Sequence, residues 1–162
     1  MQDLKKLLQL LLEHEVDFVL VGGFACTTYG ASLVTQDLDI CLSITEEQIS
    51  KLRKALKNVN PIHRMNPNFQ PTLFEYPKKI EDTKNIYLKT DIGVLDILSE
   101  ITPIGGFKRI KERAQTVSLY GFKCQIISLD DLIQCKKAMP RPKDKEAVAQ
   151  LEIIKKKMLH KI

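Results

Sequence analysis

Two apolar runs near the N-terminus constrain the fold most, because each holds residues that a hydrophobic core does not favour. The first run ends in Gly22-Gly23, although glycine costs backbone entropy in a regular element. The second run contains Asp37 and Asp39 on either side of Leu38. Side chains alternate faces along a strand, so the two carboxylates share one face while Leu38 points into a core. Such a pair requires a neutralising partner.

A third acid, Asp96, stands in the middle of the apolar run Val94–Leu98. If this strand lies beside the strand of the Asp pair, three carboxylates converge. Mg²⁺ binds carboxylate oxygens together with substrate phosphates, and such a site holds the two ions used for in-line phosphoryl transfer. Asp91 is a rival third acid, although its place beside Gly93 also suits a turn residue. The simpler alternatives are exposed edge-strand acids and an Asp96 paired with a nearby lysine.

The glycine pair leads from a predicted strand into a predicted short helix over Phe24–Tyr29, which Gly30 closes. Backbone N–H groups at such a junction approach a phosphate closely, and the helix N-terminus adds partial positive charge. No Gly-Lys-Ser/Thr follows, and no G-x-G-x-x-G is present, so neither a Walker A loop nor a dinucleotide fingerprint is predicted. The alternative is a tight turn before a helix.

Helical and strand patterns interleave along the rest of the chain. Helices are predicted over residues 4–12, 45–59, 108–114, 128–138 and 144–157. Strands are predicted over residues 17–21, 38–42, 73–76, 85–89, 94–98, 116–120 and 122–127. Thr45 with Gln48 resembles a capping box, and Asp144 is the expected N-cap of the last helix. The pattern predicts a single α/β domain over residues 1–162, with a mixed sheet flanked by helices.

Composition limits the partners and the compartment. The formal net charge of +5 and the pI of about 9.0 are compatible with a polyanionic ligand such as a nucleoside triphosphate or RNA. The four cysteines form no C-x-x-C pair, so no zinc cluster is expected. No secretory leader is recognised, and the leucine-rich stretch 7–12 is too short to span a bilayer. We therefore expect a cytoplasmic protein with no membrane partner.

The spacing of these motifs resembles a known signature. Val21-Gly22-Gly23, then thirteen residues, then Asp37-Leu38-Asp39-Ile40 is similar to the signature of the polymerase-beta-like nucleotidyltransferase superfamily, and Asp96 matches its third acid. The stretch ISLDDLIQCKKAMPRPKDKEAVAQL resembles the closing segment of small bacterial nucleotidyltransferase-like proteins, including relatives of abortive-infection and toxin–antitoxin nucleotidyltransferases. The resemblance covers nearly the whole chain and is weakest over Asn60–Lys84.

The resemblance implies a nucleotidyltransferase that moves a nucleoside monophosphate from an NTP to an acceptor hydroxyl and releases pyrophosphate. Asp37 and Asp39 would hold the metals that bind the triphosphate, and Asp96 would help to hold the metal that activates the acceptor. Two Mg²⁺ ions are the implied cofactors. The implied nucleotide-binding residues are Gly22, Gly23, Thr35 and Lys136, with the glycines against the β- and γ-phosphates.

One position departs from the pattern. Relatives often carry an arginine two residues before Thr35, where this chain has Leu33. A catalytically inactive domain that binds a nucleotide, RNA or a protein partner is therefore one alternative. Another alternative is the toxin of a toxin–antitoxin pair, with tRNA as acceptor and an antitoxin protein as partner. Lys136 also belongs to a basic run that suits a solvated surface, namely Lys136, Lys137, Arg141, Lys143 and Lys145.

Overall fold

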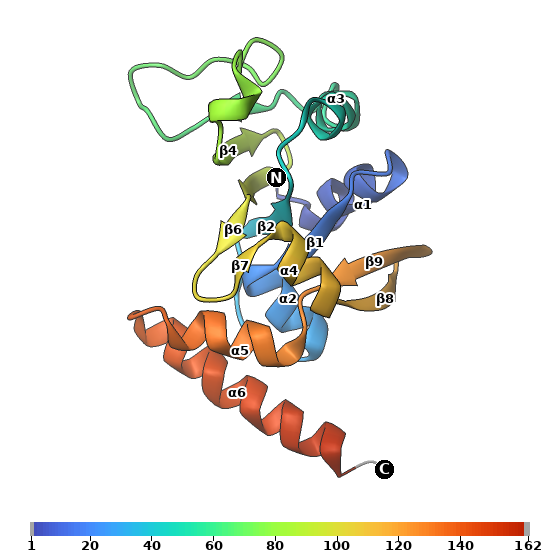
Figure 1. The fold of residues 1–162 in the computed structure, drawn as a ribbon, viewed down its shortest axis with the longest axis vertical. Helices are drawn as coiled ribbons and strands as arrows, with labels where there is room; N and C mark the ends of the chain where they lie inside the picture. The colour runs from blue at the N-terminus through green and yellow to red at the C-terminus, as the bar shows by residue number, and fades with distance from the viewer. Residues whose placement is uncertain (1, 161–162) are drawn as a thin grey trace.

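The computed structural model describes residues 2–160, and a mixed seven-stranded sheet of order β3-β4-β5-β2-β1-β9-β8 lies at its centre (Figure 1). The strands of this sheet are β1 (Phe18–Val21), β2 (Asp37–Leu42), β3 (Ile62–His63), β4 (Asn85–Thr90), β5 (Gly93–Leu98), β8 (Gln115–Leu119) and β9 (Phe122–Ile126). A separate pair joins β6 (Glu100–Ile101) to β7 (Gly105–Gly106). The predicted α/β class with a mixed sheet is confirmed.

In the described part of the chain, six α-helices and one 3₁₀ turn surround the strands. They are α1 (Leu4–Glu13), α2 (Gly22–Tyr29), α3 (Glu46–Ala55), η1 (Ile80–Asp82), α4 (Phe107–Arg113), α5 (Leu129–Lys137) and α6 (Pro142–Leu159). Helix α1 packs against α3 and the sheet. Helices α5 and α6 pack against each other and against α2, at the bottom of the view in Figure 1. The sheet and both helical groups share one connected apolar cluster, which extends from Leu7 in α1 to Leu151 in α6. Within residues 2–160, no helix is long and apolar enough to cross a membrane.

Strand β2 lies at the centre of the sheet and sets the positions of the acids. It runs antiparallel to β1 and parallel to β5, and the register places Asp39 directly opposite Asp96. Leu38 and Ile40 are fully buried on the opposite face, so the predicted alternation along this strand is confirmed. The parallel pairing is possible because a long connection through α3, β3 and β4 separates β2 from β5 along the chain.

Side-chain caps fix the start of several helices, as the sequence predicts. Thr45 accepts a hydrogen bond from the backbone N–H of Gln48 at 3.2 Å, and Ser128 accepts one from that of Asp131 at 3.1 Å. The capping box at Thr45 is nevertheless incomplete. The Gln48 side chain accepts a hydrogen bond from the backbone N–H of Asp17 at 2.9 Å, so it joins α3 to the start of β1 instead.

Three element predictions are wrong. The expected strand over 73–76 is a turn, and only Thr72 bridges to Ile62 there. Pro71 and Pro77 flank this turn and lack the N–H donors that a strand needs. Helix α3 ends at Ala55 rather than near residue 59.

The last of the three concerns the start of α6, which begins at Pro142 with Arg141 as its N-cap. Proline is favoured in the first turn of a helix, where its missing N–H has no intrahelical partner to lose. Asp144 is consequently inside the helix. Its buried side chain is used in ion pairs rather than as a cap.

Candidate active site

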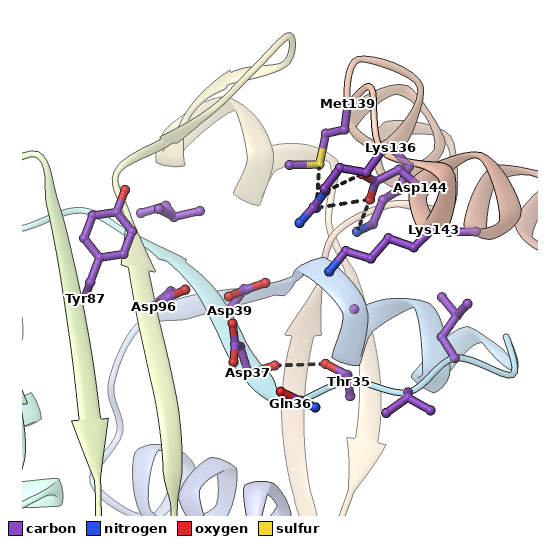
Figure 2. A pocket seen from close by; sticks show the side chains of 16 residues that line it. Thr35, Gln36, Asp37, Asp39, Tyr87, Asp96, Lys136, Met139, Lys143 and Asp144 are labelled. Atoms are coloured by element: carbon purple, nitrogen blue, oxygen red, sulfur yellow. Dashed lines mark hydrogen bonds and ion pairs between the residues drawn. The ribbon is translucent and has the colours of Figure 1, made fainter. Parts of the chain in front are cut away.

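The structure brings the three predicted acids together. One carboxylate oxygen from each of Asp37, Asp39 and Asp96 lies within 4.8 Å of the other two. Figure 2 shows them on one face of the neighbouring strands β2 and β5. The grouping follows from the register, because residues paired across two adjacent strands point to the same side of a sheet. Asp91, the rival third acid, lies in the turn after β4 and accepts a hydrogen bond from the Asn60 side chain at 2.7 Å.

The glycine pair allows the start of α2 to approach these acids. Gly22 has a φ of +69°, and a Cβ at this position would overlap the Asp39 carboxylate. A Cβ on Gly23 would lie 2.9 Å from the Thr35 hydroxyl oxygen. Thr35 in turn donates a hydrogen bond to the backbone carbonyl of Asp37 at 3.0 Å. The N-terminus of α2 has no side-chain cap, so its N–H groups are open to an anionic ligand beside the acids.

Burial and the charges of neighbouring acids raise the pKa values of Asp39 and Asp96. Burial, followed by the charges of Asp96 and Asp37, raises the pKa of Asp39 to about 6. Burial also raises the pKa of Asp96, although the neighbouring Arg64 opposes this effect. A group of three carboxylates, only one of which is paired with a cation at hydrogen-bond distance, supplies the oxygen ligands that suit a hard divalent cation. The residues present therefore fit the metal site that the sequence predicts.

Arg64 is a site residue that the sequence analysis missed. Its Nη2 donates to both carboxylate oxygens of Asp96, at 2.8 and 2.9 Å. Its guanidinium lies 5.8 Å from the centroid of the Tyr87 ring, and its buried Nε has no hydrogen-bond partner within the described chain. The backbone N–H of Arg64 donates to the carbonyl of Tyr87 at 3.0 Å, which fixes this segment beside β4. No periodic pattern in the proline-rich stretch pointed to this position.

A basic wall stands opposite the carboxylates, at the junction of α5 and α6. Lys136 and Arg141 both pair with Asp144, at 3.2 and 2.7 Å. Burial alone would raise the pKa of Asp144, but the hydrogen bonds from Arg141 and Lys136 outweigh burial and lower it. Lys136 thus lines the cavity, as predicted, but a carboxylate holds its ammonium group. The salt bridges found among residues 2–160 include none to Lys143, whose side chain extends toward the carboxylates in Figure 2.

The acids, Gly23 and the basic wall line one cavity of about 620 Å³, whereas Gly22 lies behind the Asp39 side chain and is not part of that lining. This volume lies within the range of small-molecule and cofactor sites. Leu33 also lines the cavity, at the position where the resemblance leads us to expect an arginine. Arg141 and Lys143 supply positive charge to the same space from another element. Lys137, by contrast, points elsewhere and pairs with Glu152 at 3.0 Å.

Solved structures with a similar fold are nucleotidyltransferases. A lincosamide antibiotic adenylyltransferase in its lincomycin-bound form has a TM-score of 0.62 at 17% identity, over 94% of this chain and 98% of that one. The antibiotic-resistance factor ANT(2″)-Ia has a TM-score of 0.57 at 10% identity, over 97% of this chain and 89% of that one. A putative nucleotidyltransferase from Thermotoga maritima has a TM-score of 0.53 at 13% identity, over 99% and 97%.

The chain therefore shares the fold of these nucleotidyltransferases, and the predicted fold class and resemblance are confirmed at the level of the fold. No protein-family model and no curated protein sequence matches the chain.

Proposed function

We propose that the chain is a metal-dependent nucleotidyltransferase. The observation that carries this proposal is the convergence of Asp37, Asp39 and Asp96 in a cavity that also contains the open N-terminus of α2. In the proposed reaction, the acceptor oxygen forms a bond to the α-phosphorus of an NTP. The bond from that phosphorus to the oxygen bridging the β-phosphorus breaks, pyrophosphate leaves with the electron pair, and Asp96 accepts the hydroxyl proton.

The residues of the chain divide this work between binding and orientation. The backbone N–H groups at Gly22 and Gly23 bind the terminal phosphates, because no side chain caps the start of α2 by a hydrogen bond. Lys143 adds a cation from the opposite wall, and Lys136 contributes charge while Asp144 holds it in place. Thr35 orients the backbone of Asp37 through its hydroxyl. Catalysis of this kind consists mostly of positioning and charge neutralisation.

Asp37, Asp39 and Asp96 are the residues that would hold the divalent cations. Two Mg²⁺ ions, when bound, would supply Lewis acidity and would neutralise charge on the triphosphate. The support for Mg²⁺ is the chemistry of the donor set, which consists of three clustered carboxylates. The similarity to an adenylyltransferase makes ATP the first donor to test.

A second candidate function is nucleotide binding without transfer. Arg64 already pairs with both oxygens of Asp96, and Leu33 stands where a cation is expected. A protein of this kind would bind Mg²⁺ and an NTP through Asp37 and Asp39 but would release no pyrophosphate. The sequence-based alternative of a toxin with a tRNA acceptor and an antitoxin partner stays a prediction, as does its relation to abortive-infection proteins.

Calorimetric titration of the four NTPs, first with Mg²⁺ and then with EDTA, is the test. We expect Mg²⁺-dependent binding of one or more NTPs, and we expect Asp37→Asn to abolish it. Asp91→Asn is the matched control, because Asp91 lies outside the acid group. Binding that survives in EDTA or in Asp37→Asn would overturn the metal site.

Transfer is then tested by incubating the protein and labelled NTP with two fractions of a cell extract, small molecules and RNA. Label that moves onto a compound in either fraction, together with pyrophosphate release, supports the enzyme and identifies the acceptor class. Label that moves at the wild-type rate in Asp39→Asn would contradict the proposed role of the acids. Binding without any transfer would favour the second candidate function.

A further inference from the structure

We propose that the acceptor is an uncharged, hydroxyl-bearing small molecule with a ring, held in a second hollow that meets the catalytic cavity at Tyr87. This inference rests on the proposed transfer function and names the acceptor side of the same site. The hollow has a volume of about 350 Å³ and is called here the aromatic hollow. The side chains of Met65, Phe69, Tyr76 and Tyr87 form most of its apolar lining.

Tyr87 connects the aromatic hollow to the catalytic cavity, because its side chain lines both. It lies directly opposite Asp96 across the antiparallel pair β4 and β5. Residues in such a pair share a face of the sheet, with their Cβ atoms about 5 Å apart. Figure 2 shows Tyr87 beside Asp96, on the side away from the basic wall. A molecule in the hollow that extends past Tyr87 would approach Asp96 from the side opposite the proposed phosphate contacts.

The rim of the hollow exposes apolar surface that the fold itself does not use. Met65 is 61% exposed and Phe69 is 52% exposed. The Phe69 and Tyr76 rings pack edge-to-face, with 5.2 Å between the ring centroids. Exposed apolar side chains that are clustered around a hollow mark a binding site more often than scattered ones do. Aromatic walls of this kind favour a ring in the ligand.

Hydrogen bonds hold the segment around the hollow in place. The His63 ring nitrogen Nε2 is 2.9 Å from the Tyr76 carbonyl oxygen. Lys89 in β4 donates to the side chain of Gln70 at 2.9 Å, and Arg53 in α3 donates to the carbonyl of Leu73 at 2.8 Å. The walls of the aromatic hollow are thus anchored to the sheet and to α3. A site formed in advance binds a small molecule with less loss of entropy.

Charge decides which class of acceptor fits. None of the residues that line the aromatic hollow, all within residues 2–160, is Lys, Arg, Asp or Glu. Two cations lie over its tyrosine rings: the Lys78 Nζ is 5.0 Å from the Tyr76 centroid, and the Arg64 guanidinium is 5.8 Å from the Tyr87 centroid. A polycationic acceptor would lack carboxylate partners there, and two single cations do not form the continuous basic track that the phosphates of a nucleic acid need. Asn66, Thr83 and Asn85 line the hollow and offer hydrogen bonds to hydroxyl groups. A neutral molecule with hydroxyls and a ring matches this combination.

The same segment offers a natural control. Phe74 is 46% exposed and lines a different hollow, together with the basic residues Arg53, Lys54, Lys57 and Lys78. Phe69→Ala and Phe74→Ala therefore remove the same side chain from two neighbouring sites of different charge. Both side chains are half exposed, so neither substitution removes a residue of the buried core.

Three probes that share a phenyl ring and differ in charge test the proposal: phenyl β-D-glucoside, phenethylammonium and phenyl phosphate. Binding is followed by NMR titration of the full chain in EDTA without nucleotide, so the result does not depend on transfer. We expect Phe69→Ala to weaken phenyl glucoside binding about tenfold, whereas Phe74→Ala leaves it unchanged. The two charged probes should bind the aromatic hollow, at the site that is lost in Phe69→Ala, several-fold more weakly than phenyl glucoside does.

Several results would overturn the proposal. The first is phenyl glucoside binding that Phe69→Ala does not weaken, and the second is charged probes that bind as tightly as the glucoside. The third is a CCA-ending oligoribonucleotide whose binding is weakened by Phe69→Ala when that of the glucoside is not. The last of these would make RNA the acceptor. Phe69→Ala should also leave the Kd for Mg²⁺-NTP unchanged while it raises the KM for a transferred small molecule.

Failure of the proposed function gives a different pattern. If the ring probe binds through Phe69 but the wild-type chain binds no NTP with Mg²⁺, the transfer function fails, and the assignment of the hollow to an acceptor fails with it. If Mg²⁺-NTP binds and Phe69→Ala has no effect on either probe binding or transfer, only the aromatic hollow is wrong.

Discussion

Asp39 has two other carboxylates near it and the backbone of Gly22 against it. Burial in this position, with the charges of Asp96 and Asp37, raises its pKa to about 6 from an ordinary value of 3.8. A folded-state pKa above the ordinary value means that the folded protein holds an extra proton between these two pH values. The metal-free protein should therefore lose stability from this group as pH rises from 3.8 to about 6.

The same raised pKa predicts the pH dependence of metal binding. A metal binds the ionised carboxylate, so the affinity for Mn²⁺ or Mg²⁺ should fall about tenfold between pH 7 and pH 5. Calorimetric titration at several pH values measures this dependence. Asp91→Asn should show the wild-type pH profile, because its carboxylate lies in a turn. An affinity that does not change between pH 7 and pH 5 would show that Asp39 is not a ligand.

Arg64 is the cation that neutralises Asp96 when no metal is bound. Arg64→Met should lower the free energy of unfolding in EDTA by about 1–2 kcal/mol, since it removes two charge-assisted hydrogen bonds from a partly exposed pair. The same substitution should tighten metal binding several-fold, because the metal no longer competes with a guanidinium. Urea unfolding with and without Mn²⁺ measures both effects.

A matched control for Arg64 is Lys51→Met, which removes a lysine paired with Glu47 at 3.5 Å on the surface of α3. This substitution should change the free energy of unfolding by less than about 0.5 kcal/mol and should leave metal affinity unchanged. Weaker metal binding in Arg64→Met would mean that Arg64 orients Asp96 for the metal instead of competing with it.

At the scale of elements, the corner between α5 and α6 positions the basic wall. The Asp144 side chain is 1% exposed and accepts hydrogen bonds from Lys136 and Arg141. Asp144→Asn should lower the free energy of unfolding by about 3 kcal/mol, because it leaves two cations beside a neutral amide in a buried network. It should also weaken Mg²⁺-NTP binding, since Lys136 loses the group that holds it. Urea unfolding and calorimetry measure the two effects.

The control for Asp144 lies between the same two helices. Glu152→Gln removes the partner of Lys137, and both of these side chains are about half exposed. Its cost should stay below about 1 kcal/mol, with no effect on nucleotide affinity. Equal effects of the two substitutions would show that the corner acts only through general packing of α5 on α6.

The elements also show how much of the fold and the site can be predicted from the sequence. The grouping of Asp37, Asp39 and Asp96 was predictable, because strand alternation is local and the only assumption was that the two strands are neighbours. Arg64 was not predictable. The backbone hydrogen bond from Arg64 to Tyr87 places it beside the site, and that contact spans a segment without periodicity.

The aromatic hollow could not be predicted from the sequence for a related reason. Met65 and Phe69 belong to a stretch whose prolines and asparagines indicate loops, and only long-range anchors such as Lys89 to Gln70 give that loop one conformation. For Asp144, by contrast, a clear local pattern led to the wrong prediction. Its local pattern suits an N-cap, but ion pairs with Lys136 and Arg141 place the side chain inside the helix pair.

On the scale of the whole molecule, two halves of different character meet at the carboxylates. One side consists of the α2, α5 and α6 helices with their basic wall, and the other consists of β3, β4 and the segment that forms the aromatic hollow (Figure 1). Strands β2 and β5 join the two sides and carry the acids. We infer that the chain folds as a single domain, because the buried apolar residues on both sides form one connected cluster.

A single domain of this kind should unfold in one transition, and a substitution far from the acids should destabilise all of it together. Leu151 in α6 is fully buried at the end of that cluster. Leu151→Ala should lower the free energy of unfolding by about 3 kcal/mol, whereas Leu159→Ala, at a side chain 62% exposed in the same helix, should change it by less than about 0.5 kcal/mol. Far-ultraviolet circular dichroism reports on the helices, and tyrosine fluorescence includes Tyr87, opposite Asp96, and Tyr76 in the aromatic hollow. Coincident urea curves from both probes in wild type and in Leu151→Ala support one cooperative unit. An early loss of helical signal in Leu151→Ala, with the tyrosine curve unmoved, would show that the α5–α6 pair unfolds separately and that the basic wall can detach from the carboxylates.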